Sequence, residues 1–201
     1  MDVRAGTATP ITREAFSRRV MEGEHVRLRR IERADIATVH KWMNDSEVMA
    51  WARFSADHMI SAAQLERDLE KDLAGEDTES VRYMVEDRAT GAPIGWCTIR
   101  TWDRKHVSAN VGIALGEKAY WGKGYGTEAM RLLLTIVFDY QGWHRADLWT
   151  LAENDRAIKS FEKAGFRLEG RERESTYYEG RYHDVVLMAQ LKSEWDARKA
   201  A

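Results

Sequence analysis

The segment from Tyr120 to Ala129 constrains the fold of this chain more than any other. It reads YWGKGYGTEA, with glycines at three alternate positions, and it runs directly into MRLLLTIVF. Apolar residues in the second part recur on one helix face, which predicts an amphipathic helix from Thr127 to Phe138. Glycines at a helix start leave backbone N–H groups uncovered, where the helix dipole favours an anion. The segment therefore favours a phosphate site, although glycine loops also make plain tight turns.

Two common nucleotide-binding motifs do not fit this glycine loop. A P-loop requires Ser or Thr directly after its lysine, but Lys123 is followed by Gly124 and Tyr125. A dinucleotide-binding fold requires GxGxxG after the first strand of a βαβ unit. Here the glycine spacing differs, and three strands of antiparallel character come first. Both nucleotide-binding motifs are therefore excluded.

Period-two alternation between turn residues predicts seven strands, and apolar spacing of 3.6 predicts helices among them. We expect strands over residues 25–31, 81–87, 93–100, 106–115, 145–151, 166–174 and 182–191. We expect helices after Asp35, over residues 61–73, from Thr127, and from Asn154 to a terminating Gly165. Residues 47–54 are expected as a loop or a further helix, and Thr12–Met21 as a short helical arm or a frayed tail.

The strand at residues 106–115 has two unlike faces. Val107, Ala109, Val111, Ile113 and Leu115 share one face and predict a buried apolar surface. The other face carries Ser108, Asn110, Gly112 and Ala114, which are small. We therefore expect another molecule or segment to lie against this second face.

Charge and composition narrow the class of protein. The chain carries 31 basic and 33 acidic residues, a net charge of −2, which argues against a nucleic-acid-binding or membrane-surface protein. It has no apolar run of the roughly 20 residues needed to cross a bilayer and no apolar signal region. Its one cysteine, Cys97, is expected as a buried strand residue rather than a reactive thiol. We therefore expect a cytoplasmic protein.

Three motifs follow one another in an order that is typical of one enzyme superfamily. They are WMNDSEV from Trp42, WGKGYGTEA from Trp121 and ENDRAIKSFEKAGF from Glu153. With these motifs the chain resembles the GNAT superfamily of acyl-CoA-dependent N-acyltransferases. Within it, the chain is similar to the branch of ribosomal-protein N-terminal acetyltransferases and spermidine acetyltransferases. The resemblance extends over about residues 24–192.

The resemblance implies an α/β (α+β) fold with a GNAT-like mixed, mostly antiparallel, splayed sheet. Six to seven strands and about four flanking helices would form a single domain at residues 23–195. Residues 1–22 would form an N-terminal tail or helical arm, and residues 196–201 a C-terminal tail. The pantetheine arm of coenzyme A is implied between the separating strands at residues 106–115 and 145–151.

The resemblance also implies acetyl-CoA as the co-substrate and no metal. The residues that it implies in coenzyme A binding are Ile113, Leu115, Trp121, Gly122, Lys123, Gly124, Tyr125, Gly126, Thr127, Asn154, Lys159 and Phe161. Asn154 is equally well explained as a helix cap, and Lys159 as a solvated helix end.

Several positions depart from the choices common in the family. Phe161 stands where many relatives have a tyrosine that protonates the leaving thiolate, Ala157 where some have serine, and Asn110 where many have glutamate. The catalytic residues are therefore expected among Glu47, His183 and Asn154. Glu47 is the first choice for the base, because the acceptor-side motif places it near the amine, and His183 is the second, because its pKa suits neutral pH. The other base candidates are Asp45, Glu153 and Asp184.

The function implied is an acetyl-CoA-dependent N-acetyltransferase that acts on a primary amine. The acceptor would be a protein N-terminus, a polyamine, an amino sugar or an aminoglycoside. The alternative is a non-catalytic module that binds or senses acyl-CoA, which the three departures favour. The expected partners are the acceptor amine or peptide N-terminus and a second copy of the chain in a homodimer, with no nucleic acid and no membrane.

Overall fold

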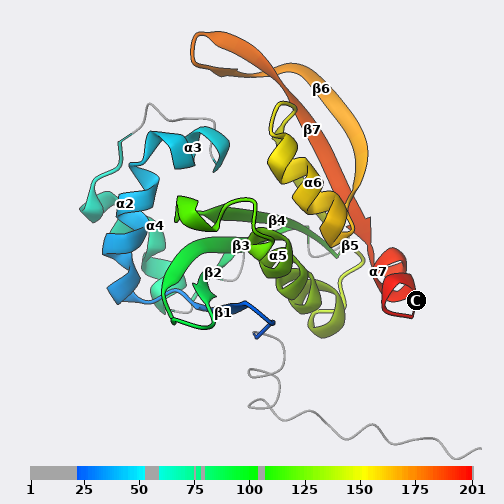
Figure 1. The fold of residues 1–201 in the computed structure, drawn as a ribbon, viewed down its shortest axis with the longest axis horizontal. Helices are drawn as coiled ribbons and strands as arrows, with labels where there is room; N and C mark the ends of the chain where they lie inside the picture. The colour runs from blue at the N-terminus through cyan, green and yellow to red at the C-terminus, as the bar shows by residue number, and fades with distance from the viewer. Residues whose placement is uncertain (1–21, 53–58, 75, 78–79, 104–106, 201) are drawn as a thin grey trace, which may run out of the picture.

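The centre of the molecule is a seven-stranded sheet with the order β1-β2-β3-β4-β5-β7-β6 (Figure 1). It is seen in a computed structural model that describes residues 22–52, 59–74, 76–77, 80–103 and 107–200. β4 and β5 are parallel, and all other neighbours are antiparallel. The strands are β1 (Val26–Arg30), β2 (Ser80–Asp87), β3 (Pro93–Asp103), β4 (Ser108–Leu115), β5 (Arg145–Leu151), β6 (Arg167–Tyr178) and β7 (Arg181–Leu191). The predicted mixed, mostly antiparallel sheet is confirmed.

Six α-helices flank the sheet in the described part of the chain, two more than the expected four. They are α2 (Ile36–Met43), α3 (Ser46–Ala52), α4 (Ala62–Ala74), α5 (Tyr125–Thr135), α6 (Asp155–Ala164) and α7 (Lys192–Ala200), with short helical turns at Arg33–Asp35, Lys118–Tyr120 and Ile136–Tyr140. For residues 47–52, α3 settles the choice left open in favour of a helix, and residues 53 and 54 lie outside the described residues. α7 continues across residue 196, where a tail was expected. The arm predicted at Thr12–Met21 lies outside the described residues, and no described helix is long and apolar enough to span a membrane.

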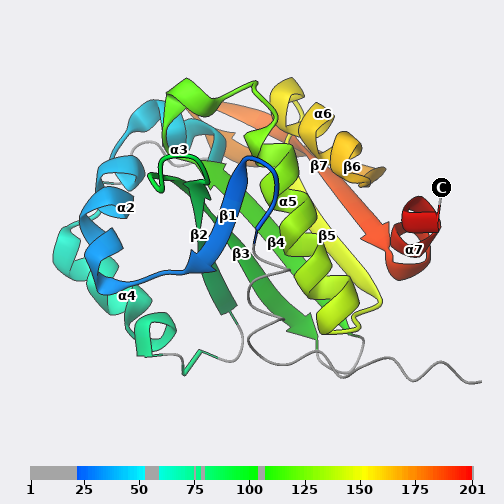
Figure 2. The ribbon, with the colours of Figure 1, turned by 60° about the horizontal axis from the view of Figure 1, so that its bottom comes forward.

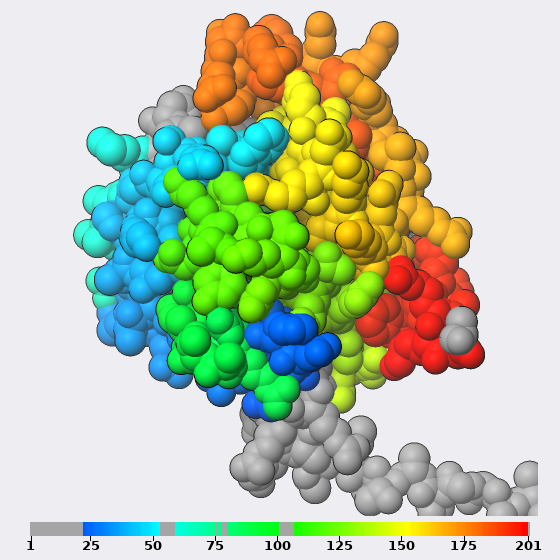
Figure 3. All heavy atoms as spheres, in the orientation of Figure 1, coloured from blue at the N-terminus to red at the C-terminus, as the bar shows by residue number. Residues whose placement is uncertain are grey.

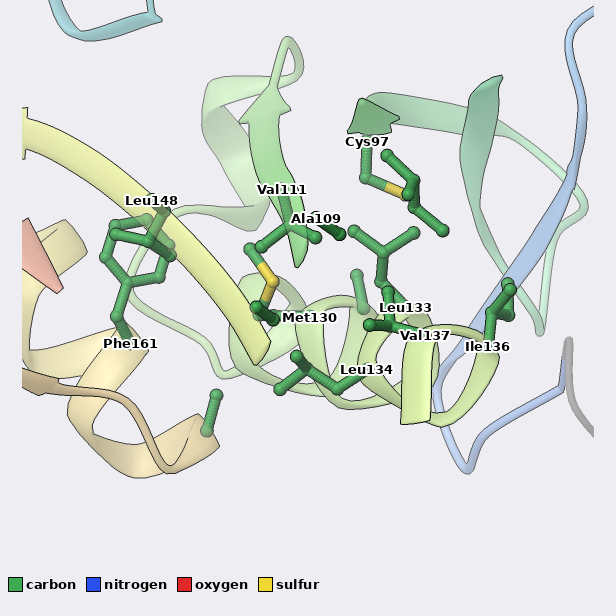
Figure 4. Packing of buried hydrophobic residues seen from close by; sticks show 14 of the residues in the cluster. Cys97, Ala109, Val111, Met130, Leu133, Leu134, Ile136, Val137, Leu148 and Phe161 are labelled. Atoms are coloured by element: carbon green, nitrogen blue, oxygen red, sulfur yellow. The ribbon is translucent and has the colours of Figure 1, made fainter. Parts of the chain in front are cut away.

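The helices divide between the two faces of the sheet (Figure 2). α5 packs on one face through Met130 and Leu133, and the helical turn after it adds Val137. All three lie in one buried cluster with Ala109 and Val111 of β4 (Figure 4). On the other face, α2, α3 and α4 form a second apolar cluster, which includes Met84 and Trp96 from the sheet. Strand alternation sends neighbouring residues of β3 to opposite clusters, Trp96 to one and Cys97 to the other. The buried position expected for Cys97 is confirmed.

The sheet splits between β4 and β5. These strands pair at Ser108–Arg145, Ala109–Ala146 and Asn110–Asp147, and the pairing stops there. β4 stays paired with β3 as far as Leu115, and β5 stays paired with β7 as far as Leu151. Each strand therefore follows its other neighbour beyond Asn110, which confirms the predicted splayed sheet.

Candidate active site

The split between β4 and β5 opens into a cavity of about 980 Å³. Its walls come from the second half of β4, the glycine loop before α5, the start of α6, and the side of α2, α3 and α4 that faces the sheet. In the space-filling view, α3 (cyan), the segment before α5 (green) and the start of α6 (yellow) adjoin at the surface (Figure 3). The cavity therefore has two halves, one beside the glycine loop and one beneath α2–α4.

The three glycines of the loop have different physical roles. Gly122 and Gly124 have φ angles of 72° and 91°, a left-handed conformation that side chains disfavour, and Gly124 is the N-cap of α5. A Cβ atom built on either would meet no atom within 4 Å. At Gly126 a Cβ would lie 3.6 Å from Leu115 Cδ1 and 3.8 Å from Ser160 Oγ, so this glycine sits close to β4 and α6. The first two glycines turn the chain and leave open space at the helix start, as an anion site requires.

Positive side chains surround this end of the cavity. Its lining includes Lys123 from the loop, Arg131 from α5, and Lys159 and Lys163 from α6. α5 and α6 are joined here by a hydrogen bond of 2.8 Å between the hydroxyls of Thr127 and Ser160. Lysines and arginines around two adjoining helices suit a ligand with several phosphates. The specific contact predicted for Lys159 stays a prediction.

Trp121 and Arg156 form the rim between the two halves. The Trp121 indole N–H donates a 2.8 Å hydrogen bond to the backbone oxygen of Leu115, and the Arg156 guanidinium carbon lies 3.9 Å from the centre of the Trp121 ring. Burial lowers the pKa of Arg156, and the charge of Glu47 acts in the opposite direction. The backbone oxygen of Leu115 already has an internal partner, so Ile113 is the freer of the two β4 positions implied in pantetheine binding. Arg156 lies within the motif that begins at Glu153, two residues after the helix cap, but the sequence assigned it no role.

Asn154 is a helix cap. Its Oδ1 accepts a 3.2 Å hydrogen bond from the Ala157 N–H, and its Nδ2 donates to Thr150 Oγ1 at 3.2 Å. The predicted capping role is thus confirmed. Asn154 also lines the cavity while being 6% exposed. Its contact with coenzyme A and its catalytic role stay predictions.

Phe161 belongs to the core and to the cavity wall at once. It is 7% exposed, packs edge-on against Phe166 with a ring distance of 6.1 Å, and lies beside Leu148 (Figure 4). This position supports a packing role for Phe161 at the cavity wall. Phe161 has no hydroxyl, so it cannot supply a proton.

The structure directs Glu47 away from the cavity. Glu47 lies at the start of α3, 60% exposed, and accepts a 2.6 Å hydrogen bond from Lys118 Nζ, which also lies 3.0 Å from Asp45. These two bonds raise the pKa of Lys118, with the Glu47 bond the larger cause. Glu47 does not line the cavity formed by the described residues. Its role as base stays a prediction that this position does not favour.

His183 is buried within the β6–β7 hairpin. It is 4% exposed, with Nδ1 3.1 Å from Glu153 Oε2 and Nε2 3.1 Å from the Tyr178 backbone oxygen. Burial would raise the pKa of Glu153, but the hydrogen bond and charge of His183, with the charge of Arg181, lower it overall. His183 is absent from the described lining of the cavity. Its catalytic role therefore also stays a prediction, and the contacts favour a structural role.

The floor of the acceptor half is the small face of β4 and its neighbours. Gly112 pairs with Thr98 of β3, which pairs with Arg82 of β2, and the next row joins Asn110 with Arg100. These five residues line the cavity. A Cβ on Gly112 would lie 3.1 Å from Thr98 Oγ1, so the space above the floor depends on this glycine. The expectation that something lies against this face is consistent with the cavity above it.

Sequence reasoning missed three charged residues of this half: Asp68, Arg82 and Arg100. Asp68 lies in α4 on the side of Leu65, Leu69 and Asp72, and thus on the stripe that faces the sheet. A charge on an apolar helix stripe was a signal in the sequence that could have found Asp68. Among the described residues, no group of three acidic, histidine or cysteine side chains could hold a metal ion.

Comparisons with known proteins agree with this geometry. The family model described as an acetyltransferase (GNAT) domain matches residues 25–167. The spermidine N(1)-acetyltransferase of Vibrio cholerae serotype O1 is 28% identical over 168 residues, covering 84% of this chain and 94% of that protein. The uncharacterized N-acetyltransferase p20 of Bacillus licheniformis is 27% identical over 172 residues, covering 86% of this chain and 96% of that protein. The crystal structure of spermidine N-acetyltransferase from Vibrio cholerae in complex with CoA and spermine superposes with a TM-score of 0.78 at 28% identity, covering 86% of this chain and 99% of that one.

Proposed function

The chain belongs to the GNAT acetyltransferase family and is an acetyl-CoA-dependent N-acetyltransferase, and we propose that it acetylates a primary amine by direct attack on the thioester. The observation that carries this proposal is the end of β4–β5 pairing at Asn110–Asp147. From that point a ligand can follow β4 toward the glycine loop, and its other end reaches the floor formed by Thr98 and Gly112. A pantetheine thioester and an amine would therefore meet beside β4.

Different parts of the site would bind different parts of acetyl-CoA. The start of α5, with Gly122, Gly124 and the surrounding lysines, would hold the pyrophosphate of coenzyme A. Backbone groups of β4 beyond Asn110, which lack a strand partner on the β5 side, would hold the pantetheine amides and donate to the oxyanion that forms during attack. Phe161 and Leu148 would shield the thioester from water.

The chemistry needs a neutral amine, because an ammonium group has no lone pair. The nitrogen forms a bond to the thioester carbon and loses one proton, the carbon–sulfur bond breaks, and coenzyme A leaves as a thiolate that takes up one proton, so the products are the amide and the free thiol. A thiol has a pKa near ~8.5, so the thiolate leaves readily without a strong acid. Phe161 at the place of the usual tyrosine is therefore compatible with turnover.

The acceptor classes proposed from the sequence are a protein N-terminus, a polyamine, and an amino sugar or aminoglycoside. Relatives named spermidine and aminoglycoside acetyltransferases support a small-molecule amine. The homodimer, the cytoplasmic location and the absence of nucleic-acid and membrane partners remain predictions.

The test is release of free thiol from acetyl-CoA by the full chain over a panel of amines, with mass spectrometry of the acetylated product. We expect at least one primary amine to be acetylated faster than water hydrolyses the thioester. Tight coenzyme A binding without turnover of any amine would instead support the non-catalytic acyl-CoA-binding module. This alternative is favoured by Asn110, Ala157 and Phe161, where the chain departs from the residues common in the family.

A further inference from the structure

Among the residues that the structure describes, the acceptor half of the cavity has an excess of positive charge. Its floor carries Arg82 and Arg100 on one face of the sheet, separated by one register row across β2 and β3. Among its described lining residues, this half has one acidic side chain, that of Asp68 on α4. An amine with further positive charges would meet two like charges here.

Among the described residues, Arg82 shares its one ion-pair partner, Asp72, with Arg30. Asp72, whose side chain is fully buried, lies 3.0 Å from Arg30 Nη2 through Oδ1 and 3.4 Å from Arg82 Nη1 through Oδ2. The same Oδ2 also accepts a 3.0 Å hydrogen bond from the Arg82 backbone N–H. One carboxylate thus serves two guanidinium groups, and the cluster keeps a net positive charge beside the cavity.

Arg100 is the more available of the two arginines. It is exposed, it lines the cavity, and its guanidinium makes no hydrogen bond or ion pair with any residue that the structure describes. Its neighbours across the sheet are Ser80 and Asn110, which are uncharged. An arginine on a cavity floor whose guanidinium has no partner among the described residues suits a carboxylate, which its planar group can bind through two parallel hydrogen bonds.

We propose that the acceptor is a small amine that also carries a carboxylate, as amino acids do, and that Arg100 with Arg82 binds this carboxylate. Asp68 is then the acidic group that attracts the amine, while the amine nitrogen reaches the thioester at β4. This inference rests on the proposed transfer of acetyl to a primary amine and deepens it. It separates this chain from polyamine acetyltransferases, whose substrate would bring several ammonium groups to the two arginines.

The experiment compares pairs of acceptors that differ by the carboxylate alone. Lysine is paired with 1,5-diaminopentane, ornithine with 1,4-diaminobutane, and leucine with 3-methylbutylamine, and spermidine is added as the polyamine. We expect kcat/KM of the preferred amino acid to exceed that of its partner by about tenfold or more, because hydrogen bonds to charged groups are among the stronger ones. Equal or higher values for the diamines and spermidine would overturn the inference while leaving the proposed transferase intact.

The second part of the experiment tests the variant Arg100→Gln on the same pairs of acceptors. We expect it to lower kcat/KM for the amino acid by about tenfold or more and to change that of the carboxylate-free partner little. Arg67→Gln is the matched control, because Arg67 is an exposed arginine of α4 outside the cavity lining. Coenzyme A affinity is measured by calorimetry on each variant, and an affinity equal to that of the parent chain verifies that the variant is folded. An equal loss for both members of a pair would overturn the carboxylate-binding role, whereas no acetylation of any amine would refute the proposed function itself.

Discussion

At the scale of single residues, the structure separates glycines that shape the loop from those that allow close packing. Gly124 has a φ angle of 91° with open space where a side chain would stand, so it is the position where a substitution acts most directly on a bound anion. Gly180 in the β6–β7 turn has a similar φ of 78° and the same open space. The two glycines therefore share a backbone conformation that a side chain would strain, and of the two only Gly124 lines the cavity.

We predict that Gly124→Val weakens coenzyme A binding by at least about tenfold. The left-handed conformation costs a side-chain-bearing residue roughly 1–2 kcal/mol, and a β-branched side chain would also stand over the amides at the start of α5. Calorimetric titration with coenzyme A measures the effect. Gly180→Val is the control and should leave the affinity unchanged. If both variants bind like the parent chain, the glycine loop does not hold the phosphates.

The proposed bases give a second prediction at this scale. Loss of a general base typically costs about 10²–10⁴-fold in rate. Glu47 is bound to Lys118, and His183 is enclosed by Glu153 and Tyr178. We therefore expect Glu47→Gln and His183→Gln each to lower kcat/KM by less than about tenfold in the free-thiol assay. A loss of a hundredfold or more in either variant, with coenzyme A affinity preserved, would restore that residue as the base.

At the scale of elements, the sequence predicted those whose signal is local. Strand alternation found all seven strands, and the Asn154 cap and Gly165 stop bounded α6. α7 was missed because KSEWDARKA has one large apolar residue, Trp195, and so no apolar stripe to detect. β6 extends to Tyr178, beyond the predicted end at residue 174. Its pairing with β7 shifts register between Glu172 and Thr176, where Glu174 adopts a φ of 50°, and the strand continues after this bulge.

The connection from β1 to α2 depends on an ion pair and gives a pH-dependent prediction. Arg29 donates two hydrogen bonds of 2.7 Å to the two oxygens of Asp35, which is 5% exposed. Burial would raise the pKa of Asp35, but the bonds from Arg29 and the Glu32 N–H and the charge of Arg29 together lower it. A lowered folded-state pKa means that the stabilisation is present above the unfolded value, near ~3.9, and is lost as the pH falls through the folded value.

We predict that Asp35→Asn lowers the free energy of unfolding at pH 7 by about 2–3 kcal/mol. Breaking a buried pair costs roughly 3–5 kcal/mol, and two features of Arg29 reduce that figure: its side chain is 28% exposed, and it keeps a second ion pair with Glu86. Urea titrations from pH 7 to pH 3 should show the difference from the parent chain shrinking below about pH 4. Asp196→Asn removes the exposed pair with Lys192 and should change stability by less than about 0.5 kcal/mol. A difference for Asp35→Asn that is constant over this pH range would contradict the assignment.

At the scale of the whole molecule, the two halves of the site differ in how far sequence could reveal them. The coenzyme half lies in two short segments, Trp121–Thr127 and Asn154–Phe161, so motifs identify it. The acceptor half gathers Asp68, Arg82 and Arg100 from one helix and two strands, which only the folded sheet brings together. No local pattern carries that information, and the charge of this half was therefore unpredicted.

The cavity lies between the two apolar clusters of the molecule, so a ligand that fills it should stabilise the fold as a whole. One cluster contains α5 and Phe161, the other contains Trp42 and Trp96, and both provide cavity walls. A ligand at about 100 times its Kd stabilises the folded state by about 2.7 kcal/mol, which for a domain of this size raises Tm by roughly 5–10 °C. We predict a shift of that size with coenzyme A in scanning calorimetry of the parent chain and of Gly180→Val.

At the same coenzyme A concentration, Gly124→Val should show a shift in Tm at least about 3 °C smaller, because tenfold weaker binding removes about 1.4 kcal/mol. An undiminished shift in Gly124→Val would mean that coenzyme A is held somewhere other than at the start of α5.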